Sequence, residues 1–147
     1  MKITYRIGNI EDIEAITELS VLLYHGDEYD DLFASNKEDL ENPEMAIFLA
    51  FDEDKALGFS HASLRHDYVE GTSGGIIGYL EGIYVNPDYR GHGIAKSLAA
   101  LCEDWARKKG CHEFASDCLL DNTDSLKFHL GIGFTEANRI ICFTKNL

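Results

Sequence analysis

Two glycines, Gly91 and Gly93, precede a long amphipathic segment and follow an apolar run at 79–85 and a turn that contains Pro87. This pattern predicts a strand, a glycine-rich turn and the start of a helix. A helix N-terminus leaves several backbone N–H groups without partners and carries partial positive charge. Glycine also lets the main chain approach a ligand closely. The stretch therefore predicts a site that binds phosphate or pyrophosphate through backbone amides.

The spacing Arg90-x-x-Gly93-x-Ala95 resembles the coenzyme A pyrophosphate loop of the GNAT superfamily of N-acetyltransferases. It differs from the common nucleotide-binding fingerprints. The resemblance implies acetyl-CoA as the co-substrate, with the pyrophosphate on residues 91–96 and the pantetheine arm and thioester along the preceding strand. The residues that it assigns to acetyl-CoA are Ile83, Tyr84, Val85, Arg90, Gly91, His92, Gly93, Ile94, Ala95, Lys96 and Asn122. The alternative is an ordinary glycine-rich connection.

A second signature of the same superfamily is matched by Asn122-x-x-Ser125-x-x-x-His129-x-x-x-Gly133-Phe134. In the superfamily a Tyr usually stands at the position of His129 and protonates the sulfur of coenzyme A. An imidazole can donate that proton near neutral pH. We therefore expect His129 to be the proton donor, with a structural, partly buried histidine as the alternative.

Three further stretches resemble the chromosomally encoded branch of aminoglycoside 6′-N-acetyltransferases. They are ASLRHDYVEG at 62–71, LEGIYV at 80–85, and ASD at 115–117 followed by DNT at 121–123. In that branch a His at the position of His129 is also usual. The resemblance implies a substrate with several ammonium groups, acetylated at its 6′-amine.

The resemblance also assigns substrate contacts. Glu81 would contact the reacting amine, directly or through water, Asp117 would hold an ammonium group, and Tyr68 would supply an aromatic contact. Tyr24 stands near the place where relatives carry Trp-Pro and would stack on a sugar ring, whereas Asn138 replaces a Glu and weakens one ammonium contact. Since an unpaired buried charge costs several kcal/mol, a carboxylate on a central strand fits a cationic ligand. The alternatives are a bulge carboxylate bonded to backbone for Glu81 and a turn cap for Asp117.

The expected reaction is direct attack of the amine on the thioester in a ternary complex, helped by Glu81 and by an oxyanion contact from backbone N–H near Ile83. No acyl-enzyme is expected, because neither motif contains a cysteine. The four cysteines show no C-x-x-C spacing, so we expect reduced thiols and no metal. Two alternatives stay open: transfer to another amine (a polyamine, a small metabolite or a protein N-terminus), and a non-catalytic acetyl-CoA sensor.

Positioning these residues requires an alternating set of strands and helices. Asn9 is the expected N-cap of a helix at 10–24, with Ile13, Ile16, Leu19, Leu22 and Leu23 on its core face. The predicted strands are 3–7, 45–51, 56–66, 79–85, 113–118 and 139–145, and the predicted helices are 10–24, 36–41, 93–109 and 122–130. This order predicts an α/β (α+β) fold with a mixed central sheet and helices on both faces, which matches the GNAT acyl-CoA N-acyltransferase fold. We expect one domain spanning 1–147.

Acidic residues dominate the first third of the chain. The formal net charge is −13, and between Glu11 and Asp54 there are 15 Asp or Glu against one basic residue, Lys37. Such a surface repels nucleic acid and attracts polycations, or simply keeps the protein soluble. No apolar run reaches the length of a membrane span, so we expect a cytoplasmic protein without membrane contact. The resemblance adds the expectation of a homodimer.

Overall fold

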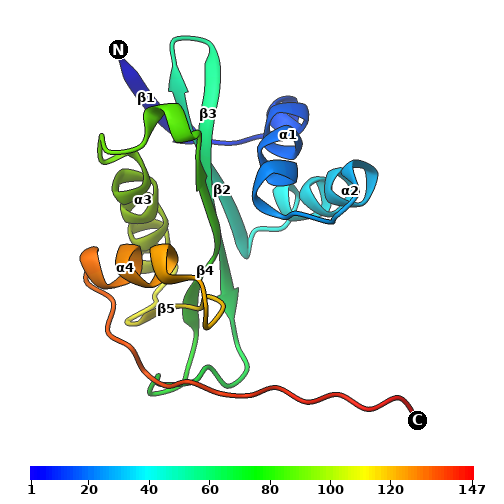
Figure 1. The fold of residues 1–147 in the computed structure, drawn as a ribbon, viewed down its shortest axis with the longest axis vertical. Coiled ribbons are helices and arrows are strands. Elements are labelled where there is room, and N and C mark those ends of the chain that lie inside the picture. Colours follow the sequence, from blue (N-terminus) through cyan, green and yellow to red (C-terminus); the bar gives the residue numbers. More distant parts are fainter.

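A five-stranded mixed sheet forms the centre of the protein (Figure 1). The computed structural model describes all 147 residues. The strands follow chain order across the sheet, with antiparallel pairing up to β4 and a parallel pair at β4–β5. Their bounds are β1 (Ile3–Ile7), β2 (Met45–Asp52), β3 (Lys55–Arg65), β4 (Ile77–Val85) and β5 (Phe114–Ser116). The predicted sheet is confirmed, although β5 is shorter than expected.

Helices cover both faces of the sheet, as predicted. Figure 1 shows α1 (Ile13–Leu23) and α2 (Tyr29–Leu40) on one side and α3 (Ile94–Lys108) on the other. The last helix, α4 (Thr123–Gly131), follows β5, and two short 3₁₀ turns, η1 (Ile10–Asp12) and η2 (Pro87–Tyr89), precede α1 and α3. The parallel β4–β5 pair is made possible by α3, which returns the chain to the end of the sheet at which β4 begins.

Strand β2 contributes to the core on both of its faces. Phe48 and Ala50 pack in the cluster that includes Leu98 of α3, whereas Ile47 and Leu49 pack in the cluster that includes Ile16 of α1. Successive side chains of a strand point to opposite faces, so a strand covered on both sides must be apolar throughout. The two helix layers therefore account for the continuous apolar run of β2.

The interface between α1 and α2 differs from the prediction. Leu22, expected in the core, is 51% exposed, whereas Thr17 and Ser20 are buried. Both hydroxyls lie 3.2 Å from Nδ2 of Asn36 in α2. A polar bridge thus joins the two helices, and apolar spacing alone places the buried face of α1 wrongly.

Helix α2 begins at Tyr29, earlier than the predicted start at Asn36. Asp30 and Asp31 lie in its first turn. Carboxylates near a helix N-terminus interact favourably with the helix dipole. The two acids are therefore compatible with an early start of α2.

The predicted final strand at 139–145 is wrong for the single chain. The segment after α4 leaves the domain as an extended arm (Figure 1), and no residue beyond Phe134 makes a backbone–backbone hydrogen bond. Ile140, Ile141 and Phe143 of this arm are 69%, 81% and 88% exposed. A strand needs a neighbour to bond to, and none of this chain's strands lies beside the arm. None of the helices combines the length and apolar character needed to cross a bilayer.

Candidate active site

The turn before α3 has the backbone geometry that its glycines allow. Gly91 and Gly93 have φ values of +85° and +76°, in the left-handed region that favours glycine. A Cβ built at either position would meet no atom within 4 Å, so the turn is open on that side. Gly93 is the N-cap of α3 and provides no side-chain cap. The first turn of α3 therefore faces open space with its N-terminal groups uncovered.

The backbone N–H groups of residues 91–96 make no hydrogen bond within the protein. The first amide to bond is that of Ser97, which donates to the carbonyl of Gly93 at 3.0 Å. Ile94 itself is buried, so only its backbone faces the turn, whereas His92 and Lys96 are exposed. Arg90 is turned back, with Nε donating to the carbonyl of Val85 at 3.0 Å. Six uncommitted amides at a helix start fit a diphosphate well, because they supply donors and positive potential together.

A β-bulge interrupts β4 at Glu81. His61 is paired with Gly82 and Ala62 with Leu80, which leaves Glu81 as the extra residue. Pairing with β5 also ends at Leu80. The segment 81–85, which contains Ile83, Tyr84 and Val85, therefore has no strand neighbour on the β5 side, and this backbone edge leads directly to the turn before α3.

Both oxygens of the Glu81 carboxylate have protein partners. Oε2 accepts from Ser63 Oγ at 2.5 Å and from Arg65 Nε and Nη2 at 3.1 and 3.0 Å. Oε1 accepts only from Arg65 Nη2, at 2.8 Å. The alternative of a bulge carboxylate bonded to backbone therefore does not describe Glu81, whose partners are side chains of β3. Its side chain is 27% exposed, so a ligand can reach it.

Asp117 is connected to the same cluster through an aromatic ring. Asp117 follows β5 and accepts a hydrogen bond from the hydroxyl of Tyr79. The guanidinium of Arg65 lies 3.4 Å from the centroid of the Tyr79 ring. Burial and the bond to Asp117 raise the pKa of the Tyr79 hydroxyl, so it stays protonated and keeps donating. Glu81 and Asp117 are thus brought into one network.

The two predicted aromatic contacts, Tyr24 and Tyr68, differ in whether they reach Glu81 and Asp117. Tyr24 lies at the end of α1, and a Cβ at Gly82 would overlap its hydroxyl, so this position must be glycine for Tyr24 to reach the bulge. Burial and the charge of Glu81 raise the pKa of Tyr24. Tyr68, 81% exposed, donates to Glu70 and has no hydrogen bond to Glu81 or Asp117. The structure therefore brings Tyr24 to the cluster and leaves Tyr68 on the loop before β4.

His129 and Asn122 lie on and before α4. Oδ1 of Asn122 accepts from the amide of Ser125 at 3.1 Å, which makes Asn122 the N-cap of α4. Nδ1 of His129 donates to the carbonyl of Ser125 at 2.7 Å, and Nε2 lies 2.8 Å from Oγ of Ser116 at the end of β5. The imidazole is therefore fixed at both nitrogens, beside the place where β4 and β5 separate.

Two participants were missed from the sequence, Arg65 and Ser116. Both fall inside stretches singled out for their resemblance, but neither was given a role. Alternation places Ser63 and Arg65 on one face of β3, since residues two apart in a strand share a face, but the bulge in β4 decides that both reach Glu81. No sequence signal points to the pairing of Ser116 with His129, because it depends on how α4 docks on β5.

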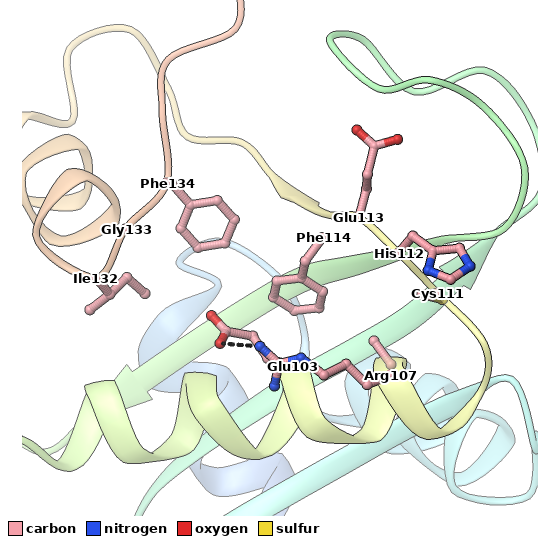
Figure 2. Close-up of a pocket in the computed structure, with 10 residues that line it drawn as sticks. Glu103, Arg107, Cys111, His112, Glu113, Phe114, Ile132, Gly133 and Phe134 are labelled. Carbon is pink, nitrogen blue, oxygen red and sulfur yellow. Dashed lines mark ion pairs between the residues drawn. The ribbon is translucent and has the colours of Figure 1, made fainter.

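A separate cavity lies away from these residues. Figure 2 shows this space of about 290 Å³ between α3, the start of β5 and the chain after α4. Phe114, Ile132 and Phe134 contribute its apolar walls, and Glu103 and Arg107 of α3 form an ion pair on its other side (Figure 2). None of the predicted site residues lines it. The cavity is therefore distinct from the candidate site.

Comparison with known proteins adds a family and relatives. The sequence profile of the acetyltransferase (GNAT) family matches residues 13–134. An aminoglycoside N(6′)-acetyltransferase type 1 of Salmonella typhimurium is 42% identical over 123 residues, which is 84% of this chain and 85% of that protein. The Serratia marcescens protein of the same name is 34% identical over 138 residues, 93% of this chain and 94% of its own.

Solved structures match over the whole chain. A structure of AAC(6′)-Iy in complex with the bisubstrate analogue CoA-S-monomethyl-acetylneamine has a TM-score of 0.95 at 37% identity and covers 100% of both chains. The aminoglycoside antibiotic 6′-N-acetyltransferase AAC(6′)-Ih of Acinetobacter baumannii has a TM-score of 0.93 at 33% identity and covers 99% of both chains. These matches exceed similarity of fold alone, because they combine high structural overlap with more than 30% identity.

Proposed function

The chain belongs to the acetyltransferase (GNAT) family, and within it to the aminoglycoside 6′-N-acetyltransferases; from this premise we propose that it acetylates the 6′-amino group of aminoglycoside antibiotics with acetyl-CoA and so confers resistance. The observation that carries the proposal is the relation between the turn and the bulge. Strand β4 bears Glu81 and ends four residues later at Val85, about 13 Å away at 3.3 Å per residue, close to the six free amides. An anion-binding turn and an acid for an amine thus lie along one strand edge.

We propose that this edge and turn bind acetyl-CoA. The free amides of residues 91–96 would hold the diphosphate, with Arg90, His92 and Lys96 adding charge around it. Backbone groups of Ile83, Tyr84 and Val85, which lack a partner strand on the β5 side, would bind the arm that carries the acetyl group. Asn122 would face the donor from the start of α4.

Glu81, Asp117, Tyr24 and Tyr68 are proposed to bind the aminoglycoside. Oε1 of Glu81 accepts a single hydrogen bond, so it has capacity for an ammonium or a water molecule. Asp117 would take a second ammonium, and Tyr24 would present its ring beside the bulge. Tyr68, exposed on its loop, would contact an outer ring of the substrate.

The proposed reaction is a direct transfer. The bound ammonium first releases one proton to solvent. The neutral amine nitrogen then attacks the thioester carbonyl and gives a second proton to Glu81, the carbon–sulfur bond breaks, and the thiolate takes a proton supplied by His129. Cys102 is unsuited to act as a nucleophile. Cys102 is buried against Ser60, and burial raises its thiol pKa to about 12, so the reactive thiolate is scarce at neutral pH.

A panel of acceptors tests this proposal. Purified protein and acetyl-CoA are combined with kanamycin, tobramycin, spermidine or a peptide with a free N-terminus, and released thiol is followed. We expect the highest kcat/KM with an aminoglycoside. A higher value for spermidine or the peptide would move the assignment to another amine, and acetyl-CoA binding without transfer to any acceptor would indicate a sensor.

We further infer that the protein is a homodimer. The support is the C-terminal arm, whose exposed Ile140, Ile141 and Phe143 form an apolar surface of a kind that a second subunit normally covers. The outer edge of β5 is free in the single chain, and the cavity of Figure 2 adjoins it. An extended arm can add a strand to such an edge, so we propose that the arm of one copy docks along β5 of the other.

The remaining proposals concern organisation and compartment. We propose that residues 1–147 work as one domain, since every residue of the candidate site lies on the single sheet or on a helix or loop that adjoins it. We also propose a cytoplasmic location, because acetyl-CoA is a metabolite of that compartment.

A further inference from the structure

Arg65 places a positive charge inside the cluster of groups proposed to receive a cation. Its Nη2 lies 2.8 Å from Oε1 and 3.0 Å from Oε2 of Glu81, and its Nε lies 3.1 Å from Oε2. The same guanidinium is stacked on Tyr79, which bonds Asp117. The protein therefore carries its own cation between the two acids, where a substrate ammonium would otherwise be the first positive charge.

The arrangement distinguishes the two oxygens of Glu81. Oε2 is anchored by three donors from Ser63 and Arg65, whereas Oε1 has one. A carboxylate oxygen has about two lone-pair positions. Oε1 is therefore the oxygen with room for a hydrogen bond from the reacting amine, and Arg65 fixes the plane of the carboxylate that presents it.

The charge of Arg65 has a chemical consequence for a bound amine. Only the neutral amine has a lone pair for attack, and an unpaired carboxylate within about 4–6 Å favours the charged ammonium by about 1–3 pKa units. A guanidinium on the same carboxylate opposes this effect. The other titratable groups around Glu81 are Tyr79, Tyr24, Asp117, and the largely buried pair of His61 and Asp39, and none of these supplies a fixed positive charge.

We propose that Arg65 is a positioning residue that partly neutralises Glu81, so that a bound substrate ammonium readily releases its first proton to solvent at neutral pH and the neutral amine is available for attack. The inference rests on the proposed function, because it needs an amine acceptor at Glu81. The same neutralisation weakens the attraction of the site for the ammonium form. Removal of the charge should consequently tighten aminoglycoside binding and slow the reaction. Loss of a merely structural contact would instead weaken aminoglycoside binding and slow the reaction.

The test compares Arg65→Gln and Arg65→Lys with the wild-type protein. The pH dependence of kcat reports groups in the substrate complex, and KM for kanamycin is measured in parallel. In Arg65→Gln we expect the acid limb of the plot of kcat against pH to shift to higher pH by about one unit. At a given pH on that limb kcat should fall about tenfold, while KM decreases. Arg65→Lys keeps the charge and should leave the limb close to that of the wild type.

Arg6→Gln is the matched control, since Arg6 forms a similar two-point pair with Asp12 on the far edge of the sheet. Coenzyme A binding by every variant checks folding. If the wild type acetylates kanamycin and the limb is unmoved in Arg65→Gln, or moves equally in Arg65→Lys, the inference about Arg65 is wrong and the proposed function stands. If the wild type acetylates no aminoglycoside, the proposed function fails and the inference fails with it.

Discussion

The imidazole of His129 and the hydroxyl of Ser116 are joined by a contact of 2.8 Å between Nε2 and Oγ. The same hydroxyl lies 3.1 Å from the carbonyl of Leu80, so Ser116 can donate either to that carbonyl or to the imidazole. Because Nδ1 bonds a carbonyl oxygen, Nδ1 carries a hydrogen in both protonation states. The charged imidazole then donates to Ser116, and the neutral one accepts from it. A proton leaving His129 would pass through Ser116.

The first prediction concerns this pair. His129→Gln should reduce kcat by about 10²-fold or more, the usual contribution of a general acid. Ser116→Ala should also lower kcat, and should add little in the His129→Gln background, because both changes interrupt one route. Stopped-time assays of the two single variants and the double variant measure this. Losses that simply multiply would contradict a shared route.

The second prediction concerns Glu81. Glu81→Gln keeps the shape and removes the base, so kcat should fall by about 10²–10⁴ while coenzyme A affinity is unchanged. Steady-state kinetics and calorimetric titration check the two parts. Glu53→Gln removes an acid from the β2–β3 turn and is the control. Full activity of Glu81→Gln would eliminate Glu81 as the base.

The third prediction uses two glycines of equal backbone strain. Gly93 at the start of α3 and Gly110 beyond its end both have positive φ, +76° and +92°, and open space around a built Cβ. Substitution by Ala should destabilise either protein by about 1–2 kcal/mol. Only Gly93→Ala should raise KM for acetyl-CoA, by about tenfold if one hydrogen bond to the charged diphosphate is lost. An equal KM in the two variants would mean that the turn does not bind the donor.

The fourth prediction follows from the pair of His61 and Asp39, whose side chains are 12% and 17% exposed and whose Nε2 and Oδ2 lie 3.3 Å apart without hydrogen-bond alignment. Burial lowers the pKa of His61 below 6.5. The unfolded chain thus binds more protons just below pH 6.5, and stability should fall as pH drops through this window. Burial raises the pKa of Asp39 above its ordinary 3.8, so the folded chain holds that proton more tightly than the unfolded chain, and Asp39 acts in the opposite direction.

Chemical denaturation at several pH values between 7.5 and 5.5 measures this dependence. His61→Gln should show a shallower decline in the free energy of unfolding than the wild type. His92→Gln, at an exposed histidine, should follow the wild type. A wild-type stability that rises on acidification would show that His61 is not the controlling group.

The fifth prediction concerns the arm. Introducing a charge by Phe143→Asp should convert dimers to monomers, because that side chain would be buried against the second copy. Sedimentation velocity provides the measurement. Leu120→Asp changes an equally exposed apolar residue, 76% exposed and outside the arm, and should leave the dimer intact. A monomeric wild type, or a dimeric Phe143→Asp protein, would refute the proposed docking.

Much of the fold could be predicted because local patterns determine it. Strand β1, the turn glycines before α3 and the cap at Asn9 each depend on neighbours in sequence, and each is found where predicted. The errors arise where distant contacts decide. Leu22 is exposed because Asn36 takes the buried face of α1 with polar bonds, and the arm has no strand neighbour in its own chain.

In the candidate site, too, local features could be predicted and distant contacts could not. Glu81 and the donor turn could be identified from residue types and spacing, whereas the partners of Glu81 could not. Arg65 reaches Glu81 across a bulge that shifts the register of β3 against β4 by one residue. Such a shift changes which side chains face each other, and no local pattern in the sequence reports it.

The most direct measurement of the central claim compares two aminoglycosides that differ only in having a 6′-amino or a 6′-hydroxyl group. Each is incubated with the protein and acetyl-CoA, and the product is examined by mass spectrometry and NMR. The account predicts one added acetyl group, on the 6′ nitrogen, and no transfer to the 6′-hydroxyl compound. Equal acetylation of both compounds, or an acetyl group on another nitrogen, would contradict it.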